Sequence, residues 1–417
     1  MNAKTGFRVA LFLKTTAIAA LALLAASLAA IAQPSARLIH FTEDGTATSP
    51  PLLPGFALHS LWSAMGQTAD GRLYVAVSNH SESEGNVALF RMDPGADRFT
   101  YLTDLKSVSQ AAGNWREGES QYKVHTFMHQ HADGLIYFAT MPSDTPQDDR
   151  GAHLYTLDPA TDTVTDLSAT APLMATRSLE IVPNTGDAGG VLFAGRGVKG
   201  MGLNPAVPDL AYTMTFDGGH LFRHDLATGD MAPVGISASV AYVFHVDAQG
   251  DAYYLGGPDP DTQAILHYDA ATGQTTGLVG GIPGNEEIGM IAPTANPDIV
   301  LVLMARSKRV FPINTATEKV LRGGNSCGKN FWKLFNMAVS PDGKWIYFVS
   351  NNNNASRIWR TPVGGGRCDE VLDVDALLGP RNLAFGGRNI WVGNSFFTPV
   401  WTHQGANDLA ILKVTVD

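Results

Sequence analysis

Basic residues are scarce in this sequence, and their shortage limits the partners that we expect. The 417 residues include 29 Lys and Arg against 39 Asp and Glu. Three of the basic residues fall within the first 32 positions, so residues 33–417 keep 26 and carry a formal charge of −13. A chain this acidic repels a phosphate backbone. We therefore expect no nucleic-acid partner.

Long apolar runs are also rare. The only extended one lies in MNAKTGFRVALFLKTTAIAALALLAASLAAIAQ, where three basic residues precede an Ala- and Leu-rich stretch that ends in Ala30-Ile31-Ala32. This pattern is typical of a secretory signal peptide, so we expect residues 1–32 to be removed and the protein to be periplasmic or secreted. A retained anchor is the alternative, although the run is short for a membrane span. We expect no stable membrane span after cleavage.

Cysteine is nearly absent, with Cys327 and Cys368 as the only two. In an oxidising compartment they can form one disulfide. Such a bridge closes a loop of about 40 residues and stabilises the fold by about 3–4 kcal/mol. Two unpaired thiols are the alternative.

Helical periodicity is almost missing, and a repeat takes its place. Five segments combine an aromatic-rich strand, an Asp or Asn, a few small residues and a second strand: FRMDPGADRFTYL, YTLDPATDTVTDL, FRHDLATGDMAPV, HYDAATGQTTGLV and FPINTATEKVLRG. Their leading Asp or Asn residues are spaced by 65, 67, 44 and 45 positions. A unit of about 45 residues with four short strands and tight Asp-Gly turns is typical of a β-propeller blade.

We therefore predict an all-β fold, with residues 33–417 forming a single β-propeller domain. Seven four-stranded blades are expected, beginning near residues 59, 122, 175, 239, 286, 333 and 379. Six or eight blades are the alternatives. The terminal segments ARLIHFTEDG and DLAILKVTVD are expected to share one blade and close the ring. Nothing in the sequence fixes the oligomeric state, and we expect a monomer.

Three histidines in KVHTFMHQHADGLIYFAT raise the question whether this segment forms a metal site or a catalytic site. The first strand of a propeller blade lines the channel and runs from the face with the long loops, the mouth, to the face with the tight turns. His125 therefore lies at the mouth, whereas His129 and His131 lie beside the Asp-Gly turn. His125 and His129 are about 13 Å apart along a strand, too far to share one metal ion. We interpret His129 and His131 as structural.

The same register places one residue of each blade at the mouth, namely Trp62, His125, Arg177, Tyr242, Glu287, Asn336 and Arg381. Lys123 and Lys333 stand just upstream of two of them, and His153 and His220 follow mouth-side loops. Trp115 and Tyr122 belong to an aromatic loop, NWREGESQY. Polar groups that merely hydrate a channel entrance are the alternative interpretation.

Cations at the mouth of an acidic protein predict an anionic ligand. Lys123, Arg177, Lys333 and Arg381 supply the charge, and an acidic polysaccharide is the natural candidate for an exported protein. Uronates are cleaved by β-elimination, in which a cation neutralises the carboxylate, a base takes the C5 proton and an acid protonates the leaving oxygen. His125 fits the base and Arg177 the clamp, with Tyr242 as a further binding residue.

The segments KVHT…ADGLIYFATM, RGAHLYTLDPATDTVTDL and AYTMTFDGGHLFRHDLATGDM make the chain resemble the secreted seven-bladed propellers that include the ulvan lyases, over roughly residues 120–235. The resemblance implies a polysaccharide lyase with His125 catalytic. It also implies a second histidine where this chain has Met141, and a tyrosine where it has Phe216; Tyr212 and His220 are the nearest candidates for these roles. Arg177 and Arg223 are the candidates for the arginine clamp.

The chain is more distantly similar to the oligogalacturonate lyases, whose propellers hold a divalent metal with several histidines. No matching histidine cluster is found at one depth, so we assign no metal ligands and no certain cofactor, with a divalent metal left as the alternative. Two other functions stay open. One is a non-catalytic periplasmic propeller that binds a glycan or a protein. The other is a lactonase-type hydrolase, for which Glu286 and Glu287 are the only mouth carboxylates to hold calcium.

Overall fold

The computed structural model describes residues 34–142, 150–216, 218–237, 244–256, 264–277, 288–294, 296–304, 309–321, 325–326, 337–352, 355–364, 366–379, 383–385, 387–401 and 409–416. The expected signal peptide and Cys327 lie outside these ranges, so the cleavage site and the disulfide remain predictions. Among the residues described, no helix has the length and apolarity to cross a membrane.

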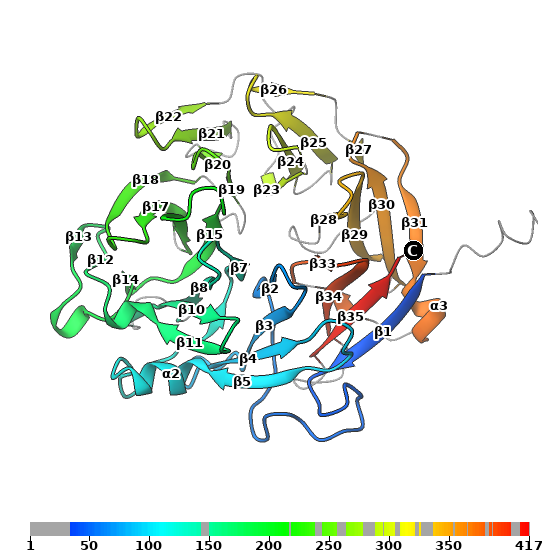
Figure 1. Cartoon of the computed structure of the whole chain (residues 1–417), viewed down its shortest axis with the longest axis horizontal. Coiled ribbons are helices and arrows are strands. Elements are labelled where there is room, and N and C mark those ends of the chain that lie inside the picture. The colour runs from blue at the N-terminus through cyan, green and yellow to red at the C-terminus, as the bar shows by residue number, and fades with distance from the viewer. Residues whose placement is uncertain are drawn as a thin grey trace, which may run out of the picture.

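Eight sheets surround a central axis and form a β-propeller (Figure 1). The first contains β2 (Met65–Gln67), β3 (Leu73–Ser78), β4 (Val87–Met92) and β5 (Thr100–Asp104). The second contains β6 (Lys123–Val124), β7 (His129–Gln130), β8 (Ile136–Met141), β10 (Leu154–Asp158) and β11 (Thr163–Asp166). The third contains β9 (Gly151–Ala152), β12 (Leu173–Ala175), β13 (Ile181–Pro183) and β14 (Phe193–Ala194). The fourth contains β15 (Val198–Leu203), β16 (Leu210–Thr215), β17 (His220–Asp225) and β18 (Met231–Ile236).

The remaining four sheets complete the ring. The fifth contains β19 (His245–Val246), β20 (Ala252–Gly256), β21 (Ala264–Asp269) and β22 (Gln274–Gly277). The sixth contains β23 (Ile288–Pro293), β24 (Ile299–Met304), β25 (Arg309–Asn314), β26 (Lys319–Val320) and β27 (Asn325–Ser326). The seventh contains β28 (Met337–Val339), β29 (Trp345–Asn352), β30 (Ala355–Pro362) and β31 (Asp369–Asp373). The eighth contains β1 (Ser35–His40), β32 (Ala384–Phe385), β33 (Ile390–Val392), β34 (Ser395–Trp401) and β35 (Leu409–Thr415).

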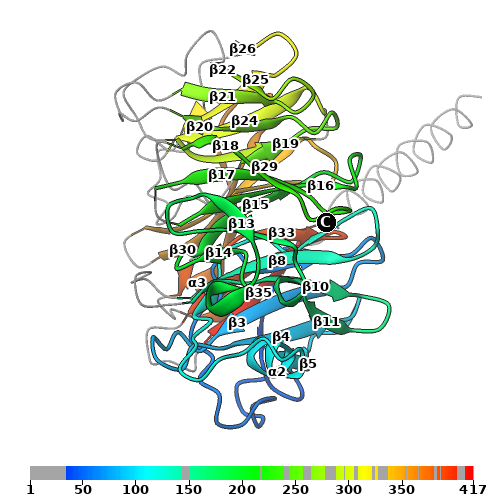
Figure 2. The same ribbon diagram turned by 90° about the vertical axis from the view of Figure 1, so that its left-hand side faces the viewer.

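Helical structure in the described ranges consists of short pieces, which are α2 (Leu105–Ala111), α3 (Val374–Leu378) and the 3-10 turns η1 (Leu167–Ala169) and η2 (Gly186–Ala188). The predicted all-β propeller is thus confirmed. Figure 2 turns the ring on edge, where the sheets on the facing side lie one above another.

The expected count of seven blades is wrong. The segment that was expected to form one blade beginning near residue 175 is divided between the third and fourth sheets. The third sheet is small, and its β12 pairs in parallel with β14 at Ala175 and Phe193. Figure 1 shows it at the outer rim, while β15 packs directly against β8. The long 67-residue spacing between Asp158 and Asp225 contained a sheet of its own rather than a loop insertion.

Burial falls from the inner strands to the outer ones within a blade. All six residues of β3 and all six of β8 are buried, because neighbouring sheets cover both of their faces. All four residues of the outermost strand β22 are exposed. The inner strands therefore have nearly continuous apolar sequences, and the outer strands are polar.

Tight turns form at the predicted Asp-Gly and Gln-Gly pairs. Gly71, Gly134, Gly250 and Gly343 have φ angles of 84°, 88°, 87° and 69°, a region that strongly favours glycine. The Asp133 carboxylate accepts a hydrogen bond from the Leu135 backbone N–H at 2.9 Å, which holds one such turn in place.

The two ends of the chain meet in the eighth sheet, as the terminal sequences predict. Strand β1 pairs antiparallel with β35 along six residue pairs, from Ser35 with Thr415 to His40 with Ala410. The N-terminal strand is thus the outermost strand of a blade whose other strands come from the C-terminus. This pairing joins the last blade to the start of the chain and closes the ring.

Candidate functional site

Seven side chains gather at the mouth around the start of β6. We call this group the mouth cluster; its members are His59, Trp62, His80, Tyr122, Lys123, His125 and Trp401. They come from the segments before β2 and after β3, from the β6 region and from the end of β34. Residues more than 300 positions apart in sequence therefore share one site, because closure of the ring brings β33 beside β2 and Trp401 of β34 beside His59.

Lys123 lies between two aromatic rings of the cluster. Its Nζ is 4.2 Å from the Tyr122 ring centroid and 5.7 Å from the Trp62 ring. Both distances are within the range of a cation–π interaction, which holds a charged amine at low hydration. Lys123 is 4% exposed, so its charge is concentrated in a largely desolvated place.

His125 also packs beside Trp62. The two ring centroids are 5.8 Å apart with an interplanar angle of 32°. His125 is 2% exposed, and it follows β6 directly. The predicted Lys-x-His pair at the mouth is therefore brought together around one tryptophan.

Tyr122 and His80 form a hydrogen-bonded pair. Tyr122 Oη and His80 Nδ1 are 2.9 Å apart, and their ring centroids are 4.2 Å apart. His80 also stacks on His59 with a centroid distance of 4.6 Å. A phenol hydrogen-bonded to an imidazole can pass a proton in either direction, since either group can act as donor.

His59 is the exposed member of the cluster. Burial of its ring and the positive charge of Lys123 both lower the pKa of His59 below its usual value of 6.5. His59 is therefore neutral at pH 7 and can accept a proton. Its backbone carbonyl accepts a hydrogen bond from Trp401 Nε1 at 2.9 Å, which fixes Trp401 at the rim.

A second buried lysine occupies the corresponding position of the neighbouring inner strand. Lys199, near the mouth end of β15, is 8% exposed, and its Nζ lies 5.0 Å from the Phe216 ring. Sequence reasoning missed it because the register was counted from residue 175, which placed Arg177 there. Arg177 is instead exposed in the turn between β12 and β13. The small residues that flank Val198-Lys199 were the feature of the sequence that could have located this inner strand.

Tyr212 lies in the packing of the fourth sheet. It is fully buried, and its Oη donates to the Gly250 carbonyl at 2.7 Å, in the tight turn after β19. Burial raises the pKa of Tyr212 above its usual value. Arg223 is opposite Tyr212 in the β16–β17 register and lines a cavity of about 390 Å³ with Asp209 and Gln249. These two predicted residues lie together, but at the tight-turn end of a different sheet from Lys123 and His125.

The other predicted residues are scattered. His220 is half-buried at the start of β17, where its backbone N–H donates to Thr215 Oγ1 at 3.1 Å. Trp115 is half-buried in the loop after α2, with Lys106 Nζ 5.8 Å from its ring. Three predicted binding residues, along with two further mouth positions, lie outside the described residues; these are Tyr242, Lys333, Arg381, Glu287 and Asn336.

His131, which was expected beside the Asp-Gly turn, makes a contact that supports the fold. His131 is 4% exposed, and its Nε2 is 2.5 Å from the Pro208 carbonyl oxygen, to which it donates. Met141, at the position where the lyase resemblance implies a histidine, is fully buried and pairs with Lys123 in the β6–β8 register. In the described ranges, no group of three or more His, Cys, Asp or Glu residues is arranged to hold a metal ion.

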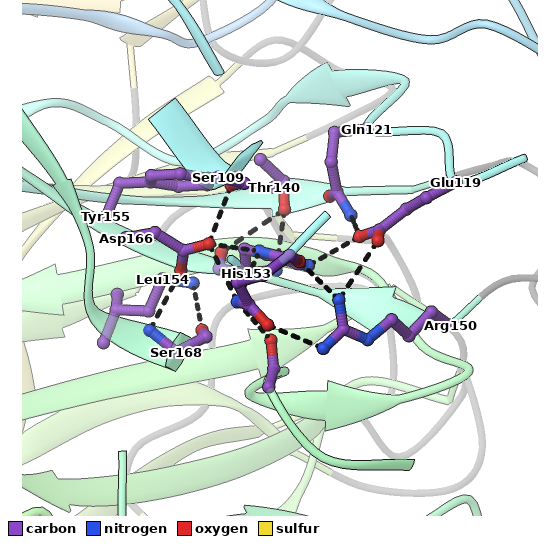
Figure 3. Close-up of polar contacts among 12 residues, drawn as sticks. Ser109, Glu119, Gln121, Thr140, Arg150, His153, Leu154, Tyr155, Asp166 and Ser168 are labelled. Carbon is purple, nitrogen blue, oxygen red and sulfur yellow. Dashed lines mark hydrogen bonds and ion pairs between the residues drawn. The ribbon is translucent and has the colours of Figure 1, made fainter. Parts of the chain in front are cut away.

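A buried charge network supports the loop that carries Tyr122 (Figure 3). His153 is fully buried; its Nε2 is 2.7 Å from Glu119 Oε1 and its Nδ1 is 2.8 Å from Asp166 Oδ2. Arg150 Nη1 is 3.1 Å from Glu119 Oε2. Asn114 Nδ2 donates to Asp166 at 2.9 Å. Two cations thus neutralise two carboxylates, and each ring nitrogen of His153 has a carboxylate within ion-pair distance.

The pKa values of this network follow from its geometry. Burial alone lowers the pKa of His153, but the Asp166 and Glu119 carboxylates outweigh it, and the net pKa is raised above 6.5. Burial alone raises the pKa of Glu119, but its bonds to His153 and the nearby Arg150 charge lower it to about 2. The sequence placed His153 at a mouth-side loop as a possible surface residue; it lies instead in the interior, where it connects β10 to residues 112–122.

Comparisons with known proteins show no family for this chain. No protein-family model matches the chain, and no curated protein sequence matches it. Among solved structures, a protein from Lactobacillus plantarum is 13% identical with a TM-score of 0.49 and covers 80% of this chain and 88% of its own. Hydrazine synthase from Kuenenia stuttgartiensis is 12% identical with a TM-score of 0.45, over 70% and 86% of the two chains. TolB from Acinetobacter baumannii is 12% identical with a TM-score of 0.38, over 83% and 80%.

Proposed function

We propose that this chain is an exported polysaccharide lyase-like enzyme that cleaves an acidic, uronate-containing polysaccharide at the mouth cluster. The observation that carries the proposal is the position of the desolvated Lys123 ammonium between Trp62 and the hydrogen-bonded Tyr122–His80 pair. A cation, proton-transfer groups and aromatic surfaces for sugar rings are the parts that β-elimination requires.

The steps are assigned to named residues. Lys123 neutralises the uronate carboxylate, which makes the C5 proton more acidic. His125 takes that proton, a double bond forms between C4 and C5, and the bond from C4 to the glycosidic oxygen breaks. Tyr122 gives its proton to the departing oxygen and is reprotonated through His80. Protons balance over the cycle once His125 releases its proton to solvent, and no oxidant or cofactor is consumed.

The proposal is tested with the mature chain, residues 33–417, incubated with ulvan, pectin, alginate and glucuronan. The ultraviolet absorbance of the unsaturated uronate distinguishes elimination from hydrolysis. We expect the absorbance to rise on one of the four substrates. Replacing His125 with Ala or Tyr122 with Phe is expected to lower the rate by about 10²–10⁴-fold, the usual contribution of general acid or base catalysis.

Tyr101→Phe is the control, because Tyr101 is a half-buried tyrosine whose hydroxyl donates a hydrogen bond to Asp104 at 3.2 Å and which lies outside the mouth cluster. Its rate should equal that of the wild type. Absence of a rise on all four substrates would count against the lyase function.

Capture of an acidic glycan without turnover is the second candidate function. The burial of His125 and Lys123, at 2% and 4% exposed, favours it, because buried side chains are less accessible to the reacting carbon of a sugar. Binding of one polysaccharide without any new absorbance would support this candidate.

A further inference from the structure

A cavity of about 440 Å³ occupies the tight-turn end of the central channel. The ends of the inner strands β2, β15, β19, β23, β28 and β33 surround it, so it lies on the axis of the propeller and is reached from the face opposite the mouth. Its walls are mainly apolar, and the residues that matter for its chemistry are Phe127, Met201, Phe244, His245, Arg388 and Trp391.

Arg388 is the cation of this cavity. Its guanidinium carbon lies 3.6 Å from the Phe127 ring centroid, and its backbone N–H donates to the Trp62 carbonyl at 2.8 Å. None of the described carboxylates forms an ion pair with Arg388, and burial is the one cause of its lowered pKa, about 9. The side chain therefore remains charged at neutral pH.

Arg388 is half-buried, and a guanidinium that is partly removed from water needs compensation for its lost hydration. A cation–π contact recovers only a small part of the penalty of removing an ion from water. Two other arginines of the described chain do have carboxylate partners close by; Arg91 pairs with Asp93 and Asp162, and Arg357 pairs with Asp373 and Glu370. Among the described residues no carboxylate pairs with Arg388, so its charge can pair with an anionic group that enters the cavity.

His245 adds a neutral polar group to the same cavity. Burial lowers the pKa of His245 to about 4, so its imidazole is uncharged at neutral pH and can donate one hydrogen bond. Asn204, another lining residue, is already committed, because its Nδ2 donates to the Val246 carbonyl at 2.9 Å and its Oδ1 accepts from the Ala206 N–H. Gln67 and Asn389 are further polar residues of the lining, and Arg388 is the one charged side chain among the lining residues described, with apolar surface around it.

We propose that the tight-turn end of the channel binds a small organic carboxylate with an apolar body. The carboxylate pairs with Arg388, for which a guanidinium offers a two-pronged geometry. The apolar body packs against Phe244, Met201 and Trp391. An inorganic anion alone leaves these walls uncovered, whereas a volume of 440 Å³ is within the usual range of small-molecule sites.

This site is separate from the mouth cluster. Phe127 and His125 are two residues apart on one segment, a distance of about 7 Å along an extended chain. Trp62 contributes its ring to the mouth and its carbonyl to the Arg388 segment. The two sites can therefore be tested by different substitutions.

The experiment measures binding of phenylacetate, phenylacetamide and inorganic phosphate to the mature chain by titration calorimetry. We expect phenylacetate to bind and the other two probes not to bind. Arg388→Gln is expected to weaken phenylacetate binding by about tenfold to a hundredfold, the equivalent of one charge-assisted contact. Arg360→Gln is the matched control, since Arg360 lies 4.2 Å over the Trp345 ring but outside the cavity, and it should bind like the wild type.

Two further variants keep the test decisive if Arg388→Gln fails to fold. Met201→Trp fills the cavity while retaining the arginine, and it should abolish phenylacetate binding. Lys123→Met changes the mouth cluster and should leave phenylacetate binding unchanged. Four outcomes would each overturn the proposal. They are equal binding of phenylacetamide, binding of phosphate alone, retained binding of phenylacetate in Arg388→Gln or Met201→Trp, and no binding of phenylacetate to the wild type.

Discussion

The role of a buried charged residue in this protein depends on the groups that contact it. His153 keeps both ring nitrogens in contact with carboxylates and is fully buried. Lys123 lies against aromatic rings and is nearly as buried. The carboxylates satisfy the charge of His153, and the aromatic rings place the Lys123 ammonium beside polarisable surfaces that a ligand can also use. We therefore assign stability to His153 and recognition to Lys123.

Replacing His153 with Ala should be strongly destabilising. The substitution leaves Glu119 and Asp166 buried with one cation fewer, and breaking such a pair costs about 3–5 kcal/mol. The free energy of unfolding from urea titration measures this loss. His267→Ala is the control, because His267 also pairs with a carboxylate at 2.8 Å but is 20% exposed, and about 1 kcal/mol or less is expected there. Equal losses in the two variants would contradict this account.

The same network predicts how stability depends on pH. The raised pKa of His153 gives stability that is complete below its unfolded value of 6.5 and is lost as the pH rises through its higher folded value. The lowered pKa of Glu119 gives stability that is complete above its unfolded value of 4.5 and is lost as the pH falls toward about 2. The contribution of the network is therefore largest between pH 4.5 and 6.5.

Thermal unfolding across this pH range, compared between the wild type and His153→Ala, measures the effect. The difference in unfolding midpoint between the two proteins should be greatest between pH 4.5 and 6.5 and should become smaller at lower and at higher pH. A difference that is constant with pH would contradict the ionic role of His153.

At the scale of the elements, the inner strands are packed so closely that some positions accept only glycine. Gly66 in β2 lies against the Met128 carbonyl, and an added Cβ would come within 1.5 Å of that oxygen. Both backbones belong to inner segments of adjacent sheets, so neither can move without displacing a blade. The close approach of β2 to the neighbouring sheet is thus set by the absence of one side chain.

Gly66→Ala should therefore destabilise the fold by about 3 kcal/mol or more, at the upper end of the usual cost of overpacking. Gly277→Ala in β22 is the matched control, because an added Cβ there meets nothing within 4 Å and the change should be nearly neutral. Chemical unfolding of both variants gives the comparison. A Gly66→Ala protein as stable as the control would show that the two sheets can separate.

The turns and strands also differ in how well the sequence predicts them. Turns such as Asp133-Gly134 were readable because glycine and a short acid have specific roles there, and the strand repeat followed from them. The third sheet was not readable, because its strands are only two or three residues long and one of its pairs is parallel. Its presence shifted the register, so Arg177 was expected where the structure has Lys199.

The sequence predicted only part of the mouth cluster, because some of its members come from loops outside the strand repeat. Lys123, Trp62 and His125 share a register at the mouth, and the repeat located all three. His59, His80 and Trp401 belong to loops or to a distant strand end, and only the closed ring brings them together. Tyr212 and Arg223 were carried over from a family resemblance, and the structure places them in a different sheet.

At the scale of the whole molecule, the ring depends on one pairing between the two ends of the chain. Strand β1 covers the outer edge of β35 along six residue pairs, and Arg37 and Lys413 both contact Asp97 of the first sheet, at 2.7 and 2.9 Å. The closure therefore involves the eighth and first sheets together. It also sets the position of Trp401 beside Trp62 in the mouth cluster.

Removal of residues 33–40 should lower the thermal midpoint and promote self-association, because the β35 edge is then free to pair with another chain. Thermal unfolding and sedimentation measure the two effects. A matched chain that keeps these residues but carries Arg37→Ala, a half-exposed side chain, should keep the oligomeric state of the wild type and lose about 1 kcal/mol or less. A shortened chain with the oligomeric state and the midpoint of the wild type would show that closure does not need β1.

The central claim is that Lys123 marks a site for acidic saccharides, and binding tests it whether or not turnover follows. Titration calorimetry of an acidic oligosaccharide compares the wild type, Lys123→Met and Lys106→Met, in which the control lysine also lies over an aromatic ring, 5.8 Å from Trp115. We predict binding that weakens by about tenfold to a hundredfold in Lys123→Met alone. Equal affinity in all three proteins, or no binding of any acidic oligosaccharide, would contradict the account.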